Sequence, residues 1–124
     1  MLIDEHHPVR EILARRLASM PGLDVVGSTS DGEEAIRDIG GLNPDVVLID
    51  TKMKRADGID ICRQALCADG HPKVAVLTSY LDPDERRRAF SVGVNGYLLK
   101  DLKDAGTDNL ANWIRLAVGR ATEE

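Results

Sequence analysis

Aromatic residues are scarce in this 124-residue chain, since Phe, Trp and Tyr together make up only 3% of it. So few rings argue against a surface that stacks nucleic-acid bases. Positive charge is not in excess either, because 16 Lys and Arg residues face 21 Asp and Glu residues and the net charge is −5. An acidic chain is poorly suited to hold a phosphate backbone. The sequence therefore predicts that this domain does not itself bind nucleic acid.

The chain has only two cysteines and no long apolar run. Cys62 and Cys67 lie five residues apart in a predicted helix, which puts them on different faces, so we expect no disulfide between them. No apolar run has the length of a membrane span, and no signal peptide precedes the first predicted strand. We therefore expect a cytoplasmic protein with no membrane contact.

The chain does contain a regular alternation of strand-like and helix-like segments. The segment 46–49 holds four consecutive apolar residues and leads into Asp50, which is typical of a strand buried on both faces of a parallel sheet. Between such runs, apolar residues recur at helical spacing, with Pro, Gly and capping Asp residues at the ends. The predicted strands are 1–3, 23–28, 46–50, 73–78 and 95–99. The predicted helices are 8–20, 31–40, 58–68, 83–92 and one that begins at Thr107.

This order predicts an α/β fold built from five βα units. Helical crossovers force the strands to pair in parallel and place helices on both faces of the sheet. No repeat, linker or low-complexity segment interrupts the pattern, so residues 1–124 are predicted to form one domain.

Polar residues stand at the ends of four predicted strands. They are Asp4 and Glu5 after the first, Asp50 on the third, Thr78 on the fourth and Lys100 after the fifth. The carboxyl ends of parallel strands meet at one edge of the sheet, which is where ligands bind in such folds. Three carboxylates there need a cation, and a set of oxygen ligands favours Mg²⁺. The pattern predicts phosphoryl transfer with Asp50 as nucleophile, Lys100 as balancing charge and Thr78 as hydrogen-bond donor.

Two histidines follow the acidic pair. His6 and His7 raise the question of a transition-metal site, but no further His or Cys lies near them in the sequence, and the oxygen ligands favour Mg²⁺. We interpret one histidine as a turn or cap residue and the other as solvated.

Taken together, five short motifs in this order resemble the receiver domain of two-component response regulators. They are IDE at 3–5, VVLID at 46–50, DG at 57–58, LTS at 77–79 and GYLLK at 96–100. The segments HHPVRE and GVNGYLLKD are most similar to receivers that precede a LuxR-type helix-turn-helix domain. The resemblance implies a CheY-like, flavodoxin-like doubly wound sandwich with strand order 2-1-3-4-5.

The resemblance also implies roles for the residues at the sheet edge. Asp50 would be the phosphoacceptor of a sensor histidine kinase. Its Mg²⁺ would be held by Asp4, Glu5, Asp50 and the backbone carbonyl of Lys52.

Thr78 and Lys100 would contact the phosphoryl group. Thr78 and Tyr97 would form a switch that alters the face made by the fourth helix, fifth strand and fifth helix. The whole chain, 1–124, would be a receiver domain with no output domain of its own. It would act as a switch rather than an enzyme, would regulate transcription through an absent DNA-binding domain, and is compatible with a homodimer.

Two departures from the usual receiver pattern motivate an alternative. Lys54 stands where many receivers have proline, and Glu5 replaces the more usual Asp. A pseudo-receiver that dimerises or docks without phosphorylation would fit both. A hydrolase with an Asp nucleophile is disfavoured, because such enzymes generally place a second Asp where this chain has Lys52. A flavin or nucleotide binder is disfavoured because no Gly-rich loop follows the first strand.

Overall fold

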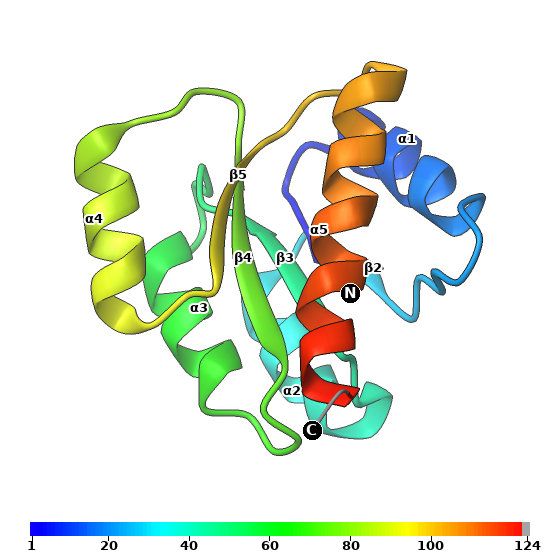
Figure 1. Ribbon diagram of the computed structural model, residues 1–124. Helices are drawn as coiled ribbons and strands as arrows, with labels where there is room; N and C mark the ends of the chain where they lie inside the picture. The colour runs from blue at the N-terminus through cyan, green and yellow to red at the C-terminus, as the bar shows by residue number, and fades with distance from the viewer. Residues whose placement is uncertain (123–124) are drawn as a thin grey trace.

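The computed structural model describes the main chain of residues 1–122 and the side chains of residues 1–103 and 105–119. Five parallel strands form one sheet in the order β2-β1-β3-β4-β5, with helices on both faces (Figure 1). The strands are β1 (Leu2–Ile3), β2 (Ser28–Thr29), β3 (Val46–Asp50), β4 (Lys73–Thr78) and β5 (Gly96–Leu99). The helices are α1 (His7–Ala18), α2 (Gly32–Leu42), α3 (Gly58–Leu66), α4 (Pro83–Val92) and α5 (Asp104–Thr122). The predicted fold class and strand order are confirmed.

Alternation along β3 divides the interior into two hydrophobic clusters, because successive strand side chains point to opposite faces. Val47 and Ile49 pack in one cluster with α2, α3 and α4. Val46 and Leu48 pack in the other with α1 and α5. All five residues of β3 are buried, which agrees with a central strand covered on both sides.

Three helices have an aspartate as their N-cap residue. The carboxylates of Asp31, Asp57 and Asp82 each accept hydrogen bonds from two main-chain N–H groups at the start of α2, α3 and α4. These caps satisfy N–H groups that have no partner within the helix. They also place each helix start directly after the loop that leaves the carboxyl end of a strand.

The predicted strand 23–28 is mostly wrong. Only Ser28 of that segment belongs to β2, and β2 pairs with β1 at Leu2 and Ile3. The pairs in this register are Leu2 with Ser28 and Ile3 with Thr29, so Val25 and Val26 lie before the paired residues. A strand needs a neighbour for its main-chain hydrogen bonds, and apolar sequence alone does not supply one.

Two helix ends also differ from the sequence prediction. α2 continues through Gly40 and Gly41 and stops at Asn43, which has φ of 48° and whose N–H bonds to the Ile39 carbonyl oxygen at 2.8 Å. Asn tolerates this left-handed conformation, and the following Pro44 prevents further helix. α5 begins at Asp104 rather than Thr107. Thr107 is buried inside the helix and donates its hydroxyl to the Lys103 carbonyl oxygen at 3.1 Å.

Both cysteines are free thiols, as predicted. Cys62 is a buried residue of α3, and Cys67 is exposed. No helix among the described residues is long and apolar enough to cross a bilayer.

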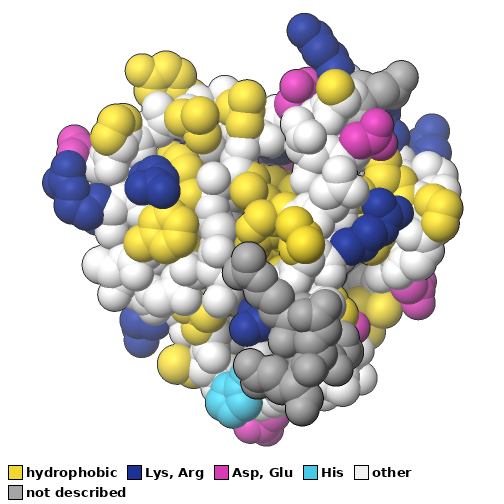
Figure 2. Space-filling model, in the orientation of Figure 1, with side chains coloured by type: hydrophobic (Ala, Val, Ile, Leu, Met, Phe, Trp, Pro, Cys, Tyr) yellow, Lys and Arg dark blue, Asp and Glu magenta, His cyan; other side chains and the backbone are white. Residues whose placement is uncertain are grey.

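Several large apolar side chains remain exposed on the face that carries α4, β5 and α5. Figure 2 shows hydrophobic side chains gathered over this face, between the two helices. Phe90 on α4, Leu99 on β5 and Leu116 on α5 are 40%, 47% and 62% exposed. We call these three side chains the α4–α5 surface. Apolar side chains on neighbouring elements favour a contact with another molecule.

Candidate functional site at the carboxyl edge of the sheet

Asp4, Asp50 and Lys100 come together at the carboxyl edge, although they are far apart in the sequence. Asp50 is the last residue of β3 and Asp4 follows β1, and both side chains are almost fully buried. The Lys100 ammonium donates to Asp4 Oδ2 at 2.7 Å and also to Asp50 Oδ2. Lys100 follows β5, and its N–H bonds to the Thr78 carbonyl oxygen at 2.6 Å. We call these three residues the edge cluster.

The charge of the edge cluster is only partly balanced. Burial alone would lower the pKa of Lys100, but hydrogen bonds and charges from Asp4 and Asp50 outweigh it and raise that pKa above its usual value. Lys100 is therefore cationic at neutral pH. Two acidic side chains thus share one ammonium in a buried place. Such a cluster attracts a cation, because unbalanced buried charge is costly.

The remaining carboxylate oxygens of the edge cluster accept main-chain hydrogen bonds. Asp4 Oδ1 accepts from the N–H of His6 at 2.8 Å, and Asp50 Oδ1 accepts from the N–H of Lys52 at 2.8 Å. These bonds fix the orientation of both carboxylates. They also hold the Lys52 main chain beside Asp50, while the Lys52 side chain is exposed.

Glu5, the third predicted carboxylate, is directed elsewhere. Its Oε1 accepts from the N–H of Lys54 at 2.8 Å and its Oε2 from the N–H of Arg55 at 3.1 Å. These two N–H groups hold the pKa of Glu5 below its ordinary value. The side chain therefore ties β1 to the loop between β3 and α3.

His6 lies nearer to the edge cluster than the sequence suggested. Asp4, His6 and Asp50 each offer one ligand atom within 4.8 Å of the others. His6 is also the N-cap residue of α1, but its side chain makes no capping hydrogen bond. His7 lies in α1, with its ring near Glu11 and Arg10. The sequence feature that could have pointed to His6 is its position directly after the two acidic residues.

Thr78 and Tyr97 are bonded to the segment that leads into α4. Thr78 Oγ1 donates to the Tyr80 carbonyl oxygen at 2.7 Å and accepts from the Tyr80 N–H at 3.1 Å. The Tyr97 hydroxyl donates to Glu85 Oε1 at 2.9 Å and accepts from the Asp82 N–H at 3.2 Å. Thr78 is buried at the end of β4, so its hydroxyl and the edge cluster lie at the same edge of the sheet. Sequence reasoning missed Glu85, a buried carboxylate within a helix that otherwise looks solvated.

The oxygen atoms of Asp4 and Asp50 fit a divalent cation in kind and in charge. Carboxylate oxygens are the ligands that Mg²⁺ prefers, and Mg²⁺ usually keeps several waters beside one or two carboxylates. Two buried aspartates with one balancing lysine match this chemistry.

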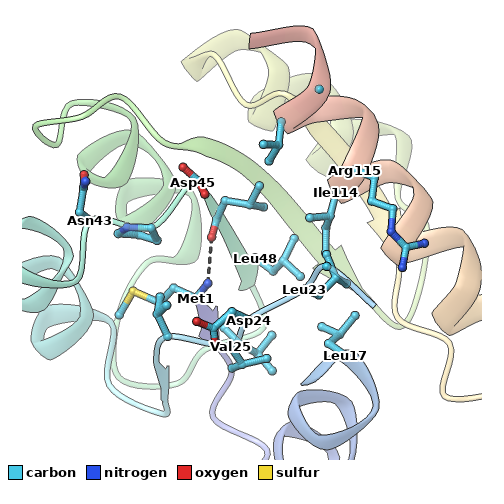
Figure 3. Close-up of a pocket in the computed structure, with 17 residues that line it drawn as sticks. Met1, Leu17, Leu23, Asp24, Val25, Asn43, Asp45, Leu48, Ile114 and Arg115 are labelled. Carbon is cyan, nitrogen blue, oxygen red and sulfur yellow. Dashed lines mark hydrogen bonds between the residues drawn. The ribbon is translucent and has the colours of Figure 1, made fainter. Parts of the chain in front are cut away.

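A hollow lies at the opposite, amino edge of β3 (Figure 3). It has a volume of about 440 Å³ and is lined mainly by apolar side chains, with Leu17, Leu23 and Ile114 among them. The Met1 amino group donates there to the Val46 carbonyl oxygen at 2.9 Å. Ligands of open α/β sheets bind at the carboxyl edge, so we place the functional site at the edge cluster.

A doubly wound parallel sheet with this set of strand-end residues defines the CheY-like class of receiver domains. The chain belongs to the response regulator receiver domain family, whose pattern it matches over residues 1–112.

Similar proteins agree with this assignment. The chain is 40% identical to the transcriptional regulatory protein LiaR of Bacillus subtilis over 94% of its length and 54% of LiaR. It is 34% identical to the DNA-binding transcriptional activator DevR/DosR of Mycobacterium tuberculosis, over 82% of this chain and 47% of that protein. The chain thus spans about half the length of the curated relatives it matches.

A solved structure shows the same fold. A LuxR-family two-component response regulator from Aurantimonas superposes with a TM-score of 0.83 at 30% identity, covering 96% of this chain and 84% of that one.

Proposed function

We propose that this chain is the phosphorylatable receiver of a two-component system and that Asp50 accepts the phosphoryl group. The observation that carries the proposal is the edge cluster, in which Asp50 is held against Asp4 and Lys100 at the carboxyl edge of the sheet. Packing alone does not explain two buried aspartates beside a buried lysine. The family supplies the reaction class, and the donor would be a sensor histidine kinase or a small phosphodonor.

In the proposed step an Asp50 carboxylate oxygen attacks the phosphorus of the donor. A P–O bond to Asp50 forms as the bond from phosphorus to the donor's imidazole nitrogen, or to the donor's oxygen, breaks. The electron pair of the broken bond leaves with the donor, and Asp50 becomes a mixed anhydride. Lys100, already bonded to Asp50, would balance charge on the incoming oxygens. The Thr78 hydroxyl would exchange its bond to Tyr80 for one to the phosphoryl group.

Asp4, Asp50 and the carbonyl oxygen of Lys52 would hold Mg²⁺. When bound, Mg²⁺ would reduce repulsion between the carboxylates and the incoming phosphoryl oxygens. Glu5 is proposed as a further ligand; its oxygens accept hydrogen bonds from the β3–α3 loop, as the oxygens of Asp4 and Asp50 accept hydrogen bonds from other groups.

The proposed output passes through the start of α4. Thr78 bonds to the main chain of Tyr80, and Tyr97 bonds to Asp82 and Glu85, so movement of Thr78 would disturb groups that position α4. The α4–α5 surface would then change its affinity for a partner that prefers one state. That partner is proposed to be a second receiver or a DNA-binding domain that regulates transcription. We propose a switch rather than a turnover enzyme, acting in the cytoplasm.

Intact mass spectrometry after incubation with acetyl phosphate and Mg²⁺ tests the proposal. We expect the parent protein to gain one phosphoryl group and Asp50→Asn to gain none. Asp45→Asn is the matched control, because Asp45 directly precedes β3 at the opposite edge and is exposed. Undiminished labelling of Asp50→Asn would reject Asp50 as the acceptor. A folded parent that gains no mass and shows no response to beryllofluoride would support the pseudo-receiver.

A further inference from the structure

Glu85 is a buried carboxyl group in a helix whose other charged side chains are exposed. It is 6% exposed, whereas residues 84 and 86–88 lie in contact with solvent. Glu85 and Ala89 are the two buried residues of α4, which packs beside α3 and β5 at the left of Figure 1. A buried carboxyl group is costly unless it is hydrogen-bonded. The contact of α4 with the core therefore depends on a hydrogen-bond donor for Glu85.

The Tyr97 hydroxyl is that donor. It donates to Glu85 Oε1 at 2.9 Å and accepts from the N–H of Asp82 at 3.2 Å, so it contacts α4 at its N-cap and again three residues later. Tyr97 itself is held in the sheet, where it pairs with Val76 of β4. One hydroxyl group therefore joins the first turn of α4 to the sheet.

Glu85 depends on this donor because of the groups around it. Among the residues that the structure describes, Glu85 forms no ion pair with a Lys, Arg or His side chain. On α3, the Cys62 thiol lies close enough for the charge of Glu85 to contribute, after burial, to raising the pKa of Cys62 to about 12. A thiol is only a weak hydrogen-bond donor. Loss of the Tyr97 hydroxyl would therefore leave the carboxyl group buried without a strong donor, which costs more than the net contribution of the bond.

We propose that Glu85 is a positioning residue that makes the position of α4 depend on the Tyr97 hydroxyl. While the hydroxyl donates to Glu85, the start of α4 stays packed against β5. When the hydroxyl withdraws, the carboxyl group regains hydrogen-bond partners from water, and this requires the start of α4 to move outward. The inference rests on the proposed function, in which phosphorylation of Asp50 moves Thr78 and the segment that Tyr97 contacts.

A double-mutant cycle without metal or phosphodonor tests the dependence of α4 on this pair. We would measure amide hydrogen exchange at residues 86–89 in the parent, Tyr97→Phe, Glu85→Ala and the double variant. We expect Tyr97→Phe alone to speed this exchange at least about tenfold, because it leaves the carboxyl group without its donor. In the Glu85→Ala background the same change should speed the exchange less than about threefold, because no buried carboxyl group remains.

Two controls separate this effect from a general loss of stability. The amides of residues 47–49 in the central strand report global unfolding in the same samples. Asp84→Ala removes a carboxyl group from the same turn of α4, but the Asp84 side chain is 79% exposed. In the Asp84→Ala background we expect Tyr97→Phe to keep its full effect. Glu85→Met repeats the cycle with an apolar side chain of similar length, so the result does not depend on the alanine variant alone.

The phosphoryl mimic beryllofluoride, added with Mg²⁺, tests the same residue in the switch. We expect the parent and Asp84→Ala to show equal changes in exchange at residues 86–89 when the mimic binds. Glu85→Ala should bind the mimic with an affinity within about threefold of the parent, but its change in exchange should be at least about threefold smaller. A residue that only stabilised the fold would not alter this response at a given occupancy.

The outcomes separate the inference from the function on which it rests. An effect of Tyr97→Phe that is equal with and without Glu85 would overturn the inference, and so would an undiminished response of α4 to the mimic in Glu85→Ala. The expected cycle in a parent that takes up neither the mimic nor a phosphoryl group would overturn the proposed function, but would support the dependence of α4 on Glu85 and Tyr97. Both results as expected would support the function and the inference together.

Discussion

At the scale of single residues, Lys100 is the group on which the edge cluster depends most. Its side chain is 4% exposed, and both of its bonded partners are buried carboxylates. Replacing it with methionine keeps most of the side-chain volume but leaves two carboxylates facing each other without compensation. Removal of one member of a buried ion pair costs about 3–5 kcal/mol.

We therefore expect Lys100→Met to lower the free energy of unfolding by about 3 kcal/mol at pH 7. Denaturation with urea, followed by circular dichroism, measures this change. Lys103→Met is the control, because the Lys103 side chain is exposed and should change stability by less than about 0.5 kcal/mol. A loss in Lys100→Met no larger than in Lys103→Met would show that the cluster does not contribute to folding.

The two cysteines should differ sharply in reactivity. Burial, with smaller contributions from the charges of Glu85 and Asp57, raises the pKa of Cys62 to about 12. Only the thiolate reacts with alkylating reagents, and Cys67 is exposed to them. At pH 8.5 we expect iodoacetamide to modify Cys67 and to spare Cys62 in the folded protein, as read by peptide mass spectrometry. Prompt modification of both thiols would contradict the buried placement of Cys62.

The raised pKa of Cys62 makes the folded protein less stable as the pH rises above the ordinary thiol pKa. The folded-state pKa of Cys62 lies above the ordinary thiol value of 9.0. The folded state therefore keeps its proton where the unfolded chain loses it. Stability from the neutral thiol is complete below pH 9 and is lost as the pH rises toward 12.

At the scale of elements, two glycines in ordered segments should respond oppositely to alanine. Gly40 lies inside α2, and a Cβ built there meets nothing within 4 Å. Alanine is the better helix former, so Gly40→Ala should raise the free energy of unfolding by about 0.5–1 kcal/mol.

Gly96 begins β5 and is buried against the ring of Trp113 on α5. A Cβ there would lie 2.6 Å from the Trp113 Cζ2 atom, so Gly96→Ala must displace a large ring and should destabilise the protein by about 1–3 kcal/mol. Thermal unfolding of the two variants side by side tests both signs. An unchanged melting temperature in Gly96→Ala would contradict the close approach of α5 to β5.

At the scale of the whole molecule, the extent of strand pairing differs across the sheet. Five residue pairs join β3 to β4, whereas two join β1 to β2. Among the residues from 23 to 27, the main-chain bond to β1 is made at Gly27, whose carbonyl oxygen accepts from Leu2 at 2.9 Å. The strands are therefore paired over more residues at the centre of the sheet than at its β2 edge.

Hydrogen exchange should reproduce this gradient. We expect the amides of Val47 to Ile49 and Val74 to Leu77 to exchange slowest, near the global unfolding limit, and those of Val25 and Val26 to exchange faster by orders of magnitude. NMR measurement under native conditions gives both rates in one sample. Equal protection of Val25 and Ile49 would contradict the uneven sheet.

The sequence was sufficient to predict the elements whose information is local. Strand β4 and the central run of β3 follow from continuous apolar residues, and α4 follows from the capping Asp82 and the Pro83 after it; these signals act within a few positions of the chain. The order of these elements was enough for the family, because the strand-end residues recur in a fixed order. Asp4, Asp50 and Lys100 were predicted to meet because parallel strands share a carboxyl edge.

Features that depend on a partner distant in the sequence became visible only in the folded structure. Val25 and Val26 look like strand residues, but the pairs between β1 and β2 are made at Ser28 and Thr29 instead. The bonds of Glu5 to the Lys54 and Arg55 N–H groups and the approach of His6 to Asp4 and Asp50 both depend on contacts that the sequence did not indicate. Which of its possible partners a side chain contacts depends on distances and angles in the folded protein, and the sequence does not state these directly.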